Sequence, residues 1–419
     1  MKTTRIDFLK SVAGTASATA FRMSAQTSTT SGTKAPPPAN RPADLGTRFA
    51  DLEKLAADNS YQLSFLGDRF RSYAEFEKTA RARIFETLLY RPEPVDPKPE
   101  ILETVDCGSY VRKRITFQTT PHFRVPAYLL VPKNLTGPAP GIVDLHSHGG
   151  MFLFGKEKVV DLGEGGSSNH VAMVPYHKGN YESRPTATAL VKRGYVVVSI
   201  DAFGFGERRI VLDKDKPEAL HRESLSVEDV TRLNRVCASK ESTIVKSLTL
   251  AGMTWPGVVF WDDIRTVDFL CSLPEVDAKR IGCLGVSMGG YRSLYLSALE
   301  PRIVAGCVAG FMSTVKPMMR AHVDTHSFIH FLPGLHRDLD LPDVASLTAP
   351  RALMVLQCAQ DGLFPLDGMR ESLSQIGAAY LKAGVADQYL GKFYDHPHIF
   401  SLAMQAEAFA WLDRHLKQS

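Results

Sequence analysis

From about residue 101 onward, short apolar runs rich in Val, Ile and Leu alternate with stretches whose apolar residues recur at helical spacing. Near-continuous apolar runs of this length are typical of strands that a parallel sheet buries on both faces. In the helical stretches, apolar residues repeat every three or four positions, as at Phe260, Ile264, Val267 and Cys271. The pattern predicts one α/β domain over 101–419, with a mostly parallel, doubly wound sheet and helices on both faces.

The same pattern locates the individual strands. Residues 111–119 and 124–131 alternate with a period of two, which predicts an opening antiparallel pair. The remaining predicted strands are 141–145, 195–201, 280–284, 303–309, 352–358 and 389–394. Two connections, about 151–182 and about 312–348, exceed ordinary loop lengths. We expect both to line a site, the second as a lid insertion.

The first hundred residues differ in composition from the rest. Residues 26–46 are rich in Ser, Thr and Pro and predict a disordered linker, because such a stretch cannot build a packed core. Residues 47–100 have a helical pattern that ends in a series of prolines. They predict a helical N-terminal segment with a Pro-rich end.

Residues 1–25 have the composition of an export signal. They combine a charged start with a weakly apolar stretch and two small-residue cleavage sites. The run from Thr4 to Lys10 is similar to a twin-arginine leader, with Ile6 in place of the second arginine. We therefore expect a periplasmic or secreted bacterial protein, with a cytoplasmic protein that has a frayed N-terminus as the alternative.

Composition and charge exclude several classes of protein. With 419 residues, of which 44% are hydrophobic and 22% charged, the chain can bury a large core. Of its net charge of +4, residues 1–25 carry +3, and basic residues nowhere interleave with aromatics as nucleic-acid binding requires. No apolar run reaches the ~20 residues of a membrane span. The sequence therefore predicts neither a nucleic-acid partner nor a membrane span, and it leaves the oligomeric state open.

The six cysteines do not suggest a metal or redox site. They include no Cys-x-x-Cys pair, and their density is too low for a disulfide scaffold. Cys283, Cys307 and Cys358 fall inside predicted strands, where we expect them to pack as small hydrophobic residues.

The strongest chemical motif is the Gly-x-Ser-x-Gly at 285–289. It stands directly between a predicted strand and a helical run, which is the context of a nucleophile elbow. The turn is so tight that side chains at Gly285 and Gly289 would collide, and it forces Ser287 into a strained, exposed conformation. Ser287 is therefore the candidate nucleophile.

A serine nucleophile needs a base and an acid that orients the base, and in this arrangement they follow in the order Ser, acid, His. Asp361 lies in the loop after the strand 352–358 and is the candidate acid. Weaker acid candidates are Asp367 and Asp395. For the base we favour His398, at a corner between loop and helix, over His396, which precedes a proline.

The oxyanion of such a reaction needs two backbone N–H donors. Met288, which follows the nucleophile, is the first candidate, and His148 or Gly149 in the glycine-rich loop 145–150 is the second. The same loop allows a metal-dependent alternative. His146 and His148 alternate on one strand face, as two metal ligands would.

Three further histidines, His322, His326 and His330, recur at intervals of four, as they would on one helix face. They could join a metal site, but a metal would leave the serine motif unexplained. Because this row lies in the expected lid, we predict that His322 or His326 touches substrate. His146 is a further candidate for substrate binding.

Other acidic residues favour structural roles. Asp262 and Asp263 head a helix that we expect to begin near Trp261, where carboxylates favour the N-terminal dipole. Glu207 lies in a loop over the sheet edge, and we expect it to pair with an arginine.

Together these motifs resemble those of the α/β-hydrolase superfamily, and within it the dienelactone hydrolase and acetyl xylan esterase-like branch. The resemblance covers about 101–419. It rests on residues 145–150, 201–208, 261–265, 276–282, 285–290, 360–365 and 397–400. One departure is Ser147, where relatives commonly carry Gly.

The resemblance implies an α/β-hydrolase fold with a Ser-Asp-His triad, which falls on Ser287, Asp361 and His398, and no cofactor or metal. It also implies the cleavage of a carboxylic ester, with an acetylated saccharide or a small aryl or alkyl ester as the substrate. The sequence-level hypothesis is an exported serine esterase with an acyl-enzyme intermediate. A serine peptidase or a C–C bond hydrolase with the same triad is the alternative, followed by a metal-dependent hydrolase that uses His146 and His148.

Overall fold

The computed structural model describes residues 42–166, 168–212, 215 and 222–417. The predicted export signal at 1–25 lies outside the described residues, as does all but the end of the predicted linker at 26–46. None of the helices in the described part of the chain is both long enough and apolar enough to cross a bilayer.

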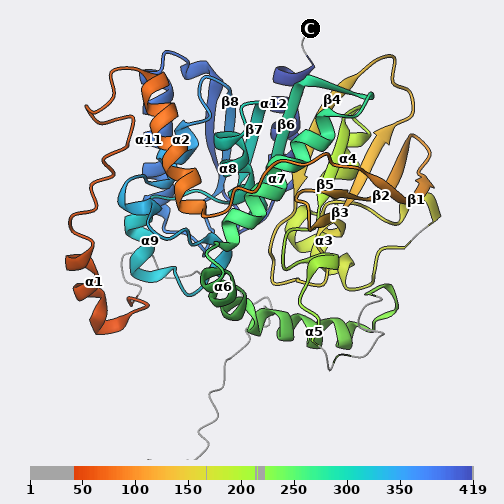
Figure 1. The fold of residues 1–419 in the computed structure, drawn as a ribbon, viewed down its shortest axis with the longest axis horizontal. Helices are drawn as coiled ribbons and strands as arrows, with labels where there is room; N and C mark the ends of the chain where they lie inside the picture. The colour runs from red at the N-terminus through yellow and green to blue at the C-terminus, as the bar shows by residue number, and fades with distance from the viewer. Residues whose placement is uncertain (1–41, 167, 213–214, 216–221, 418–419) are drawn as a thin grey trace, which may run out of the picture. The chain divides into compact units, whose positions relative to one another are not determined.

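Within the described residues, nine strands form one sheet, in the order β1-β2-β3-β5-β4-β6-β7-β8-β9 (Figure 1). The strands are β1 (Glu100–Asp106), β2 (Tyr110–Gln118), β3 (Arg124–Pro132), β4 (Ala139–Leu145), β5 (Val196–Ile200), β6 (Val276–Val286), β7 (Ile303–Ala309), β8 (Ala352–Cys358) and β9 (Tyr389–Tyr394). Strands β4 to β9 pair in parallel, whereas β1, β2 and β3 join by antiparallel pairing. The predicted α/β fold class is confirmed.

All eight predicted strands are present, and the last three, β7 to β9, have the predicted limits. The strand that the sequence analysis missed is β1, which pairs antiparallel with β2, so the predicted opening pair is a three-stranded unit. Its side chains are exposed at all but one position. An edge strand with this exposure carries no alternation between apolar and polar residues, so the pattern gave no signal for it.

The helices of the described chain connect the strands and cover the sheet. They are α1 (Phe49–Leu55), α2 (Tyr73–Leu88), α3 (Met173–Tyr181), α4 (Thr186–Val191), α5 (Val227–Ser239), α6 (Glu241–Leu250), α7 (Trp255–Cys271), α8 (Met288–Leu299), α9 (Val315–Ala321), α10 (Leu341–Ser346), α11 (Leu366–Lys382) and α12 (Leu402–Leu416).

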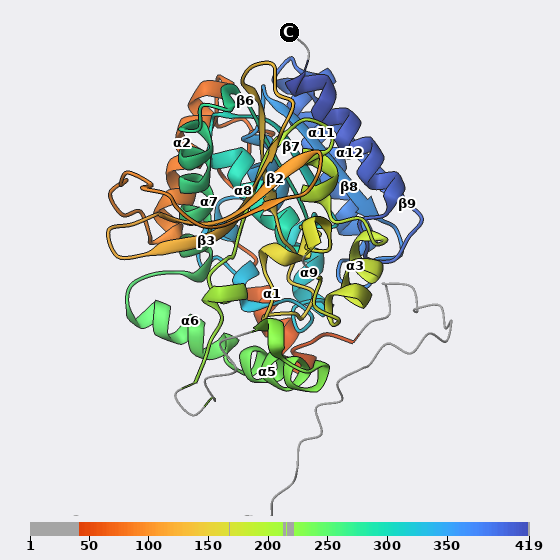
Figure 2. The same ribbon diagram turned by 90° about the vertical axis from the view of Figure 1, so that its right-hand side faces the viewer.

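Helices α8 and α12 lie on opposite faces of the sheet. The thiol of Cys283 in β6 contacts the hydroxyl of Ser297 in α8, at 3.3 Å between Sγ and Oγ. The preceding residue, Gly282, faces Leu416 of α12. Successive residues of a strand face opposite sides, so the two helices cover different faces. Figure 2 shows α7 and α12 on either side of the strands. The predicted doubly wound arrangement is therefore present.

Strand order reverses at β4, which has β5 on one side and β6 on the other although β5 comes before β6 in the chain. Ligands of open parallel sheets bind at the carboxyl ends of the strands, beside such a reversal. The loops that follow β4, β6, β8 and β9 all leave from this edge, and together with the first residue of α8, Met288, they carry the predicted triad and oxyanion site.

The N-terminal segment 47–100 contributes to the same core as the sheet. Phe76, Ala80 and Ile84 of α2 are fully buried and belong to the cluster that includes the helices beside β6 and β7. The Arg81 guanidinium donates a hydrogen bond from Nε to the carbonyl oxygen of Ala298, at the end of α8 (3.1 Å). The segment thus supports the helix that follows the candidate nucleophile.

The prediction for Asp262 and Asp263 is wrong. Helix α7 begins at Trp255, capped by the Thr254 hydroxyl, so the two carboxylates lie within the helix. Both are buried, and each pairs with an arginine, Asp262 with Arg208 (2.7 Å) and Asp263 with Arg292 (2.6 Å). They join neighbouring elements and do not serve the helix terminus.

The cysteines pack as expected. Cys283, Cys307 and Cys358 lie in β6, β7 and β8 and are fully buried. All six thiols of the chain fall within the described residues, and none is in a disulfide. Burial raises the pKa of the Cys283 thiol to about 12 and that of Cys358 to about 11.

Candidate active site

The turn after β6 has the strained geometry that the Gly-x-Ser-x-Gly motif predicts. Ser287 has φ 60° and ψ −124°, a backbone conformation that residues other than glycine rarely adopt. A Cβ at Gly285 would lie 2.5 Å from the Gly289 carbonyl carbon, and one at Gly289 would overlap the carbonyl oxygen of Leu145. The Ser287 amide donates a hydrogen bond to Ala309 O at the end of β7 (2.9 Å), which anchors the turn.

The loops after β8 and β9 bring a carboxylate and an imidazole into contact. Nδ1 of His398 and Oδ2 of Asp361 are 2.6 Å apart. The other carboxylate oxygen, Oδ1, accepts a hydrogen bond from the Leu363 amide (2.9 Å), and the Asp361 side chain is fully buried. The carboxylate therefore fixes Nδ1 as the protonated nitrogen of neutral His398, and it leaves Nε2 as the nitrogen that can accept a proton.

Ser287 and His398 line the same cavity, which has a volume of about 380 Å³. His148 and Gly149, which follow β4, form part of its wall, together with Glu241 of α6. Residues 324–327 also line it and contribute polar groups, and Phe152, Phe311 and Phe364 contribute aromatic rings. The cavity thus combines a strained serine, an oriented imidazole and hydrogen-bonding groups.

The weaker candidates lie apart from this pair. His396 stacks on Tyr394, and its backbone carbonyl accepts a hydrogen bond from the Gln360 amide (3.0 Å). Asp395 accepts a hydrogen bond from the Gln360 side chain at the surface (2.8 Å), and Asp367 lies in the first turn of α11. Among the described residues, none of these three lines the cavity of Ser287.

His146 is fully buried and engaged with the backbone. Its Nε2 accepts a hydrogen bond from the Ala202 amide (3.1 Å), so Nδ1 carries the proton and donates to Ser147 O (3.0 Å). Burial, reinforced by the neighbouring Lys158, holds the pKa of His146 well below its usual value. Both nitrogens are occupied, and in the described chain no group of three or more potential ligands could hold a metal ion.

A buried lysine, Lys158, holds the loop after β4, and the sequence did not predict this role. Nζ of Lys158 donates to the carbonyl oxygens of Ser147 (2.8 Å) and His148 (2.9 Å). In a trans peptide the C=O and the N–H point in opposite directions. The amides that follow these carbonyls, those of His148 and Gly149, therefore point away from Lys158.

Both ring nitrogens of His148 are engaged in hydrogen bonds within the protein. Its Nδ1 accepts a hydrogen bond from the Gly150 amide (3.0 Å), so its Nε2 carries the proton and donates to Oε1 of Glu241 (2.9 Å). The same oxygen accepts a hydrogen bond from the Ser327 hydroxyl (2.7 Å). Burial tends to raise the pKa of Glu241, but these hydrogen bonds outweigh it and the pKa is lowered. Glu241 thus ties the loop after β4 to the segment after α9.

The three histidines spaced by four residues do not share a helix. Helix α9 ends at Ala321, His322 follows as its C-cap, and the next helical turn, a 3₁₀ turn, begins only at Phe328. His326 and His330 nevertheless line the cavity of Ser287, with ring centroids 5.5 Å apart. His322 is buried and is absent from the described residues that line this cavity.

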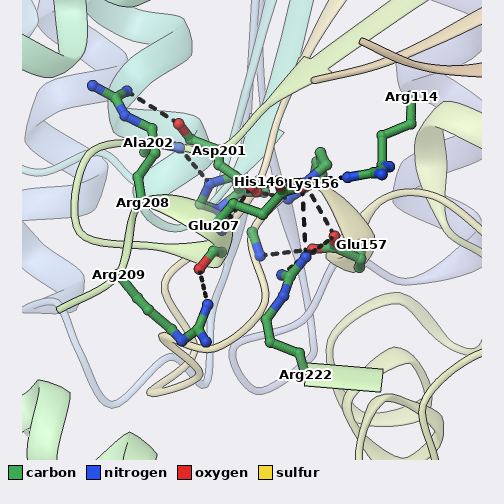
Figure 3. A network of polar contacts seen from close by, with 12 residues as sticks. Arg114, His146, Lys156, Glu157, Asp201, Ala202, Glu207, Arg208, Arg209 and Arg222 are labelled. Atoms are coloured by element: carbon green, nitrogen blue, oxygen red, sulfur yellow. Dashed lines mark hydrogen bonds and ion pairs between the residues drawn. The ribbon is translucent and has the colours of Figure 1, made fainter. Parts of the chain in front are cut away.

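A network of buried charges supports the whole loop region (Figure 3). Nζ of Lys156 lies 2.7 Å from Asp201 Oδ2 and 2.7 Å from Glu207 Oε1, and Arg222 pairs with Glu157 at 3.0 Å. Burial acts against ionisation of Glu157, but Arg222 and Lys156 outweigh it and lower its pKa. The expected pairing of Glu207 with an arginine is present, because Arg114 and Arg222 each lie 3.7 Å from one of its carboxylate oxygens, although Lys156 is its nearest partner.

The strand order, the reversal beside β4 and the sharp serine turn after β6 define the chain as an α/β-hydrolase. More particularly, it belongs to the Abhydrolase family, whose model matches residues 46–392. The predicted superfamily is therefore confirmed. The match begins well before residue 101, so the family region also includes the helical segment that precedes the sheet.

Sequence and structure comparisons identify several similar proteins. A Bacillus subtilis (strain 168) protein named "Putative hydrolase YtaP" is 26% identical over 340 residues, which cover 80% of this chain and 98% of that protein. A Bacteroides fragilis structure described as a "putative acetyl xylan esterase" has a TM-score of 0.63 at 17% identity, and the match covers 83% of this chain and 82% of that one. A glucuronoyl esterase from Solibacter usitatus has a TM-score of 0.57 at 16% identity, covering 84% and 96% of the two chains. At 16% and 17% identity, these two solved structures show that the fold is shared.

The serine turn generates a first prediction. Replacing Gly289 with alanine places a methyl group against the Leu145 carbonyl oxygen, so we expect Gly289→Ala to lower the free energy of unfolding by at least ~3 kcal/mol. Gly137→Ala is the matched control, because a Cβ there meets no atom within 4 Å. Denaturant unfolding of both variants measures the difference. Equal stability of the two would contradict the close approach at the turn.

Proposed function

We propose that this protein is an exported serine esterase that cleaves carboxylic esters through an acyl-enzyme intermediate. One observation carries the proposal: a strained serine and an imidazole paired with a buried carboxylate line one cavity. In this proposal Ser287 is the nucleophile, His398 the base and Asp361 the group that orients the base.

The reaction proceeds in two halves. The hydroxyl oxygen of Ser287 attacks the ester carbonyl carbon while Nε2 of His398 takes the hydroxyl proton. The tetrahedral intermediate collapses when His398 returns this proton to the leaving alkoxide, which departs as the alcohol. Water, deprotonated by His398, then attacks the acyl-serine, and the carboxylic acid leaves with Ser287 restored. Asp361 stabilises the imidazolium that forms in each half.

The negative charge of each intermediate falls on the former carbonyl oxygen, where backbone N–H groups stabilise it. Met288, at the start of α8, supplies one N–H in this proposal. His148 and Gly149 are the candidates for the other, and the direction of their amides, away from Lys158, supports both. The orientation of this loop thus depends on a side chain that itself never meets the substrate.

Lys158 is therefore a positioning residue. Its ammonium group lies over the Phe205 ring, 4.8 Å from the centroid, and is fully buried. Burial lowers its pKa well below the usual value of lysine. Even the neutral amine keeps two N–H donors, one for each carbonyl that it holds.

For the substrate we propose an acetylated saccharide or a small aryl or alkyl ester. The proteins of similar fold described as acetyl xylan and glucuronoyl esterases support this class by analogy. The cavity wall adds a physical reason. It offers the side chains of Asn180, Glu241, Asp324, Thr325 and Ser327, a set that suits a ligand with several hydroxyl groups.

A second prediction tests the triad. Ser287→Ala and His398→Ala should each lower kcat for p-nitrophenyl acetate by at least ~10³-fold, because both groups take part in every proton transfer. His396→Ala is the matched control and should keep its activity. A fluorophosphonate probe should label Ser287 of the native protein. If His396→Ala is inactive while His398→Ala is active, the assigned base is wrong, and an unlabelled, inactive native protein would contradict an esterase.

A third prediction concerns Lys158. Lys158→Met keeps an unbranched side chain that is one atom shorter and removes both donors, so we expect kcat to fall by ~10²-fold, as when an oxyanion donor is lost, with KM changed less than threefold. Steady-state kinetics on p-nitrophenyl acetate and the melting temperature separate this effect from unfolding. A folded variant with native kcat would show that Lys158 does not position the loop.

A fourth prediction concerns location. The charged start and apolar stretch of residues 1–25 support export to the periplasm or the medium. Expressed at full length in a bacterium, the protein should accumulate in the periplasmic fraction or the medium, with an N-terminus that begins near residue 21 or 26. A variant that lacks residues 2–25 should stay in the cytoplasm. Full-length protein found uncleaved in the cytoplasm would refute export.

A further inference from the structure

A second cavity lies beside the one that Ser287 lines, and the reaction described above makes no use of it. Its volume is about 390 Å³, within the range of small-molecule sites. Helix α9, drawn in cyan in Figure 1, and the segment 331–337 form much of its wall. The lining is largely apolar and includes Tyr291, Val315, Met318, Phe331, Leu332 and Leu341.

The two cavities share part of their walls. Phe311, His326 and His330 line both of them. The shared rings pack closely, with centroids 4.9 Å apart between Phe311 and His330 and 5.5 Å apart between His326 and His330. Only these side chains separate the two cavities, so a substituent on an ester bound at Ser287 enters the second cavity when the shared rings move apart.

The two imidazoles in this wall have unused hydrogen-bonding capacity. Nε2 of His326 and both ring nitrogens of His330 are buried, and they find no hydrogen-bond partner in the described residues. Burial lowers the pKa of His326 to about 4 and that of His330 well below its usual value, so both rings are neutral near pH 7. A neutral imidazole offers one donor and one acceptor, and buried polar atoms without partners carry a free-energy cost that a ligand can remove.

The mouth of the second cavity is also apolar. Val323 and Phe331 line the cavity and keep 37% and 40% of their surface exposed, so this apolar lining extends to the protein surface. Large apolar side chains at the rim of an apolar cavity favour a ligand that removes them from water. The lining thus differs from that of the cavity at Ser287, whose wall includes the carboxylates of Glu241 and Asp324 beside its aromatic rings.

We propose that the second cavity binds an aromatic group carried by the ester, and that His326 and His330 hydrogen-bond a polar substituent on that ring. The inference rests on the proposed esterase function and narrows its substrate class to esters with an aromatic acyl or aryl part, such as a phenolic acid attached to a saccharide. The ester bond lies at Ser287 and the ring beyond the shared wall.

The test compares esters that differ only in the part that would occupy the cavity. Methyl acetate is the reference, methyl 4-hydroxycinnamate carries the ring on the acyl side, and 1-naphthyl acetate carries it on the alcohol side. Met318→Trp fills the cavity from α9, so the ratio of kcat/KM for an aromatic ester to that for methyl acetate should fall at least tenfold. If the ratio falls for methyl 4-hydroxycinnamate, the cavity binds the acyl side of the ester. If it falls for 1-naphthyl acetate, the cavity binds the alcohol side.

Two further variants make the result decisive. Val315→Phe fills the same cavity from another position and replaces Met318→Trp if circular dichroism shows that the latter is unfolded. Lys316→Trp places the same bulk on α9 at an exposed position that lines neither cavity, and should leave the ratios unchanged.

The outcomes separate this inference from the esterase function. If both filling variants keep both ratios within twofold of native, the second cavity does not bind the aromatic group. The esterase function then still stands if the native protein cleaves methyl acetate and is labelled at Ser287. A native protein that cleaves none of the three esters, with Ser287 unlabelled, would overturn both proposals together.

Discussion

The buried ion pairs around Lys156 set the geometry on which the site depends. An isolated charge in a protein interior costs several kcal/mol, so a network of this kind is stable only when every member keeps its partner. Asp201, at the end of β5, holds both the backbone amide and Nζ of Lys156 (2.8 and 2.7 Å). Arg222 closes the network on Glu157. The short turn 156–158 is thereby fixed to the sheet, although it belongs to a long connection.

Lys158, the last residue of this turn, connects the ion-pair network to the candidate active site. Lys158 lies under the loop after β4 and holds two successive carbonyl oxygens, which directs the following amides away from it. On the other side of β4, the serine turn approaches the same loop so closely that only glycine fits at position 289. The backbone of the loop after β4 therefore lies between the buried Lys158 amine and the nucleophile's helix, with little freedom to move.

The sequence predicted the sheet and the loops of the candidate site because both depend on strong local signals. Apolar runs located most of the parallel strands. Ser287 and Asp361 each follow such a run, and His398 follows the last predicted strand. The residues around 156–158 were missed for a physical reason: a Lys-Glu-Lys run reads as a solvated surface, and only the fold brings Asp201 and Arg222 to it. The start of α7 was misplaced because buried carboxylates such as Asp262 can stand inside a helix when an arginine from elsewhere in the fold pairs with them.

The cysteines have a consequence for where this fold can mature. A thiol is oxidised through its thiolate, so a buried thiol with a raised pKa reacts slowly. Burial gives Cys237, Cys283, Cys307 and Cys358 this protection, and Cys271, which is only half-buried, also has a raised pKa. These five thiols of the folded protein therefore need neither a disulfide-forming nor a reducing environment. They would remain free thiols in an oxidising compartment as well as in a reducing one.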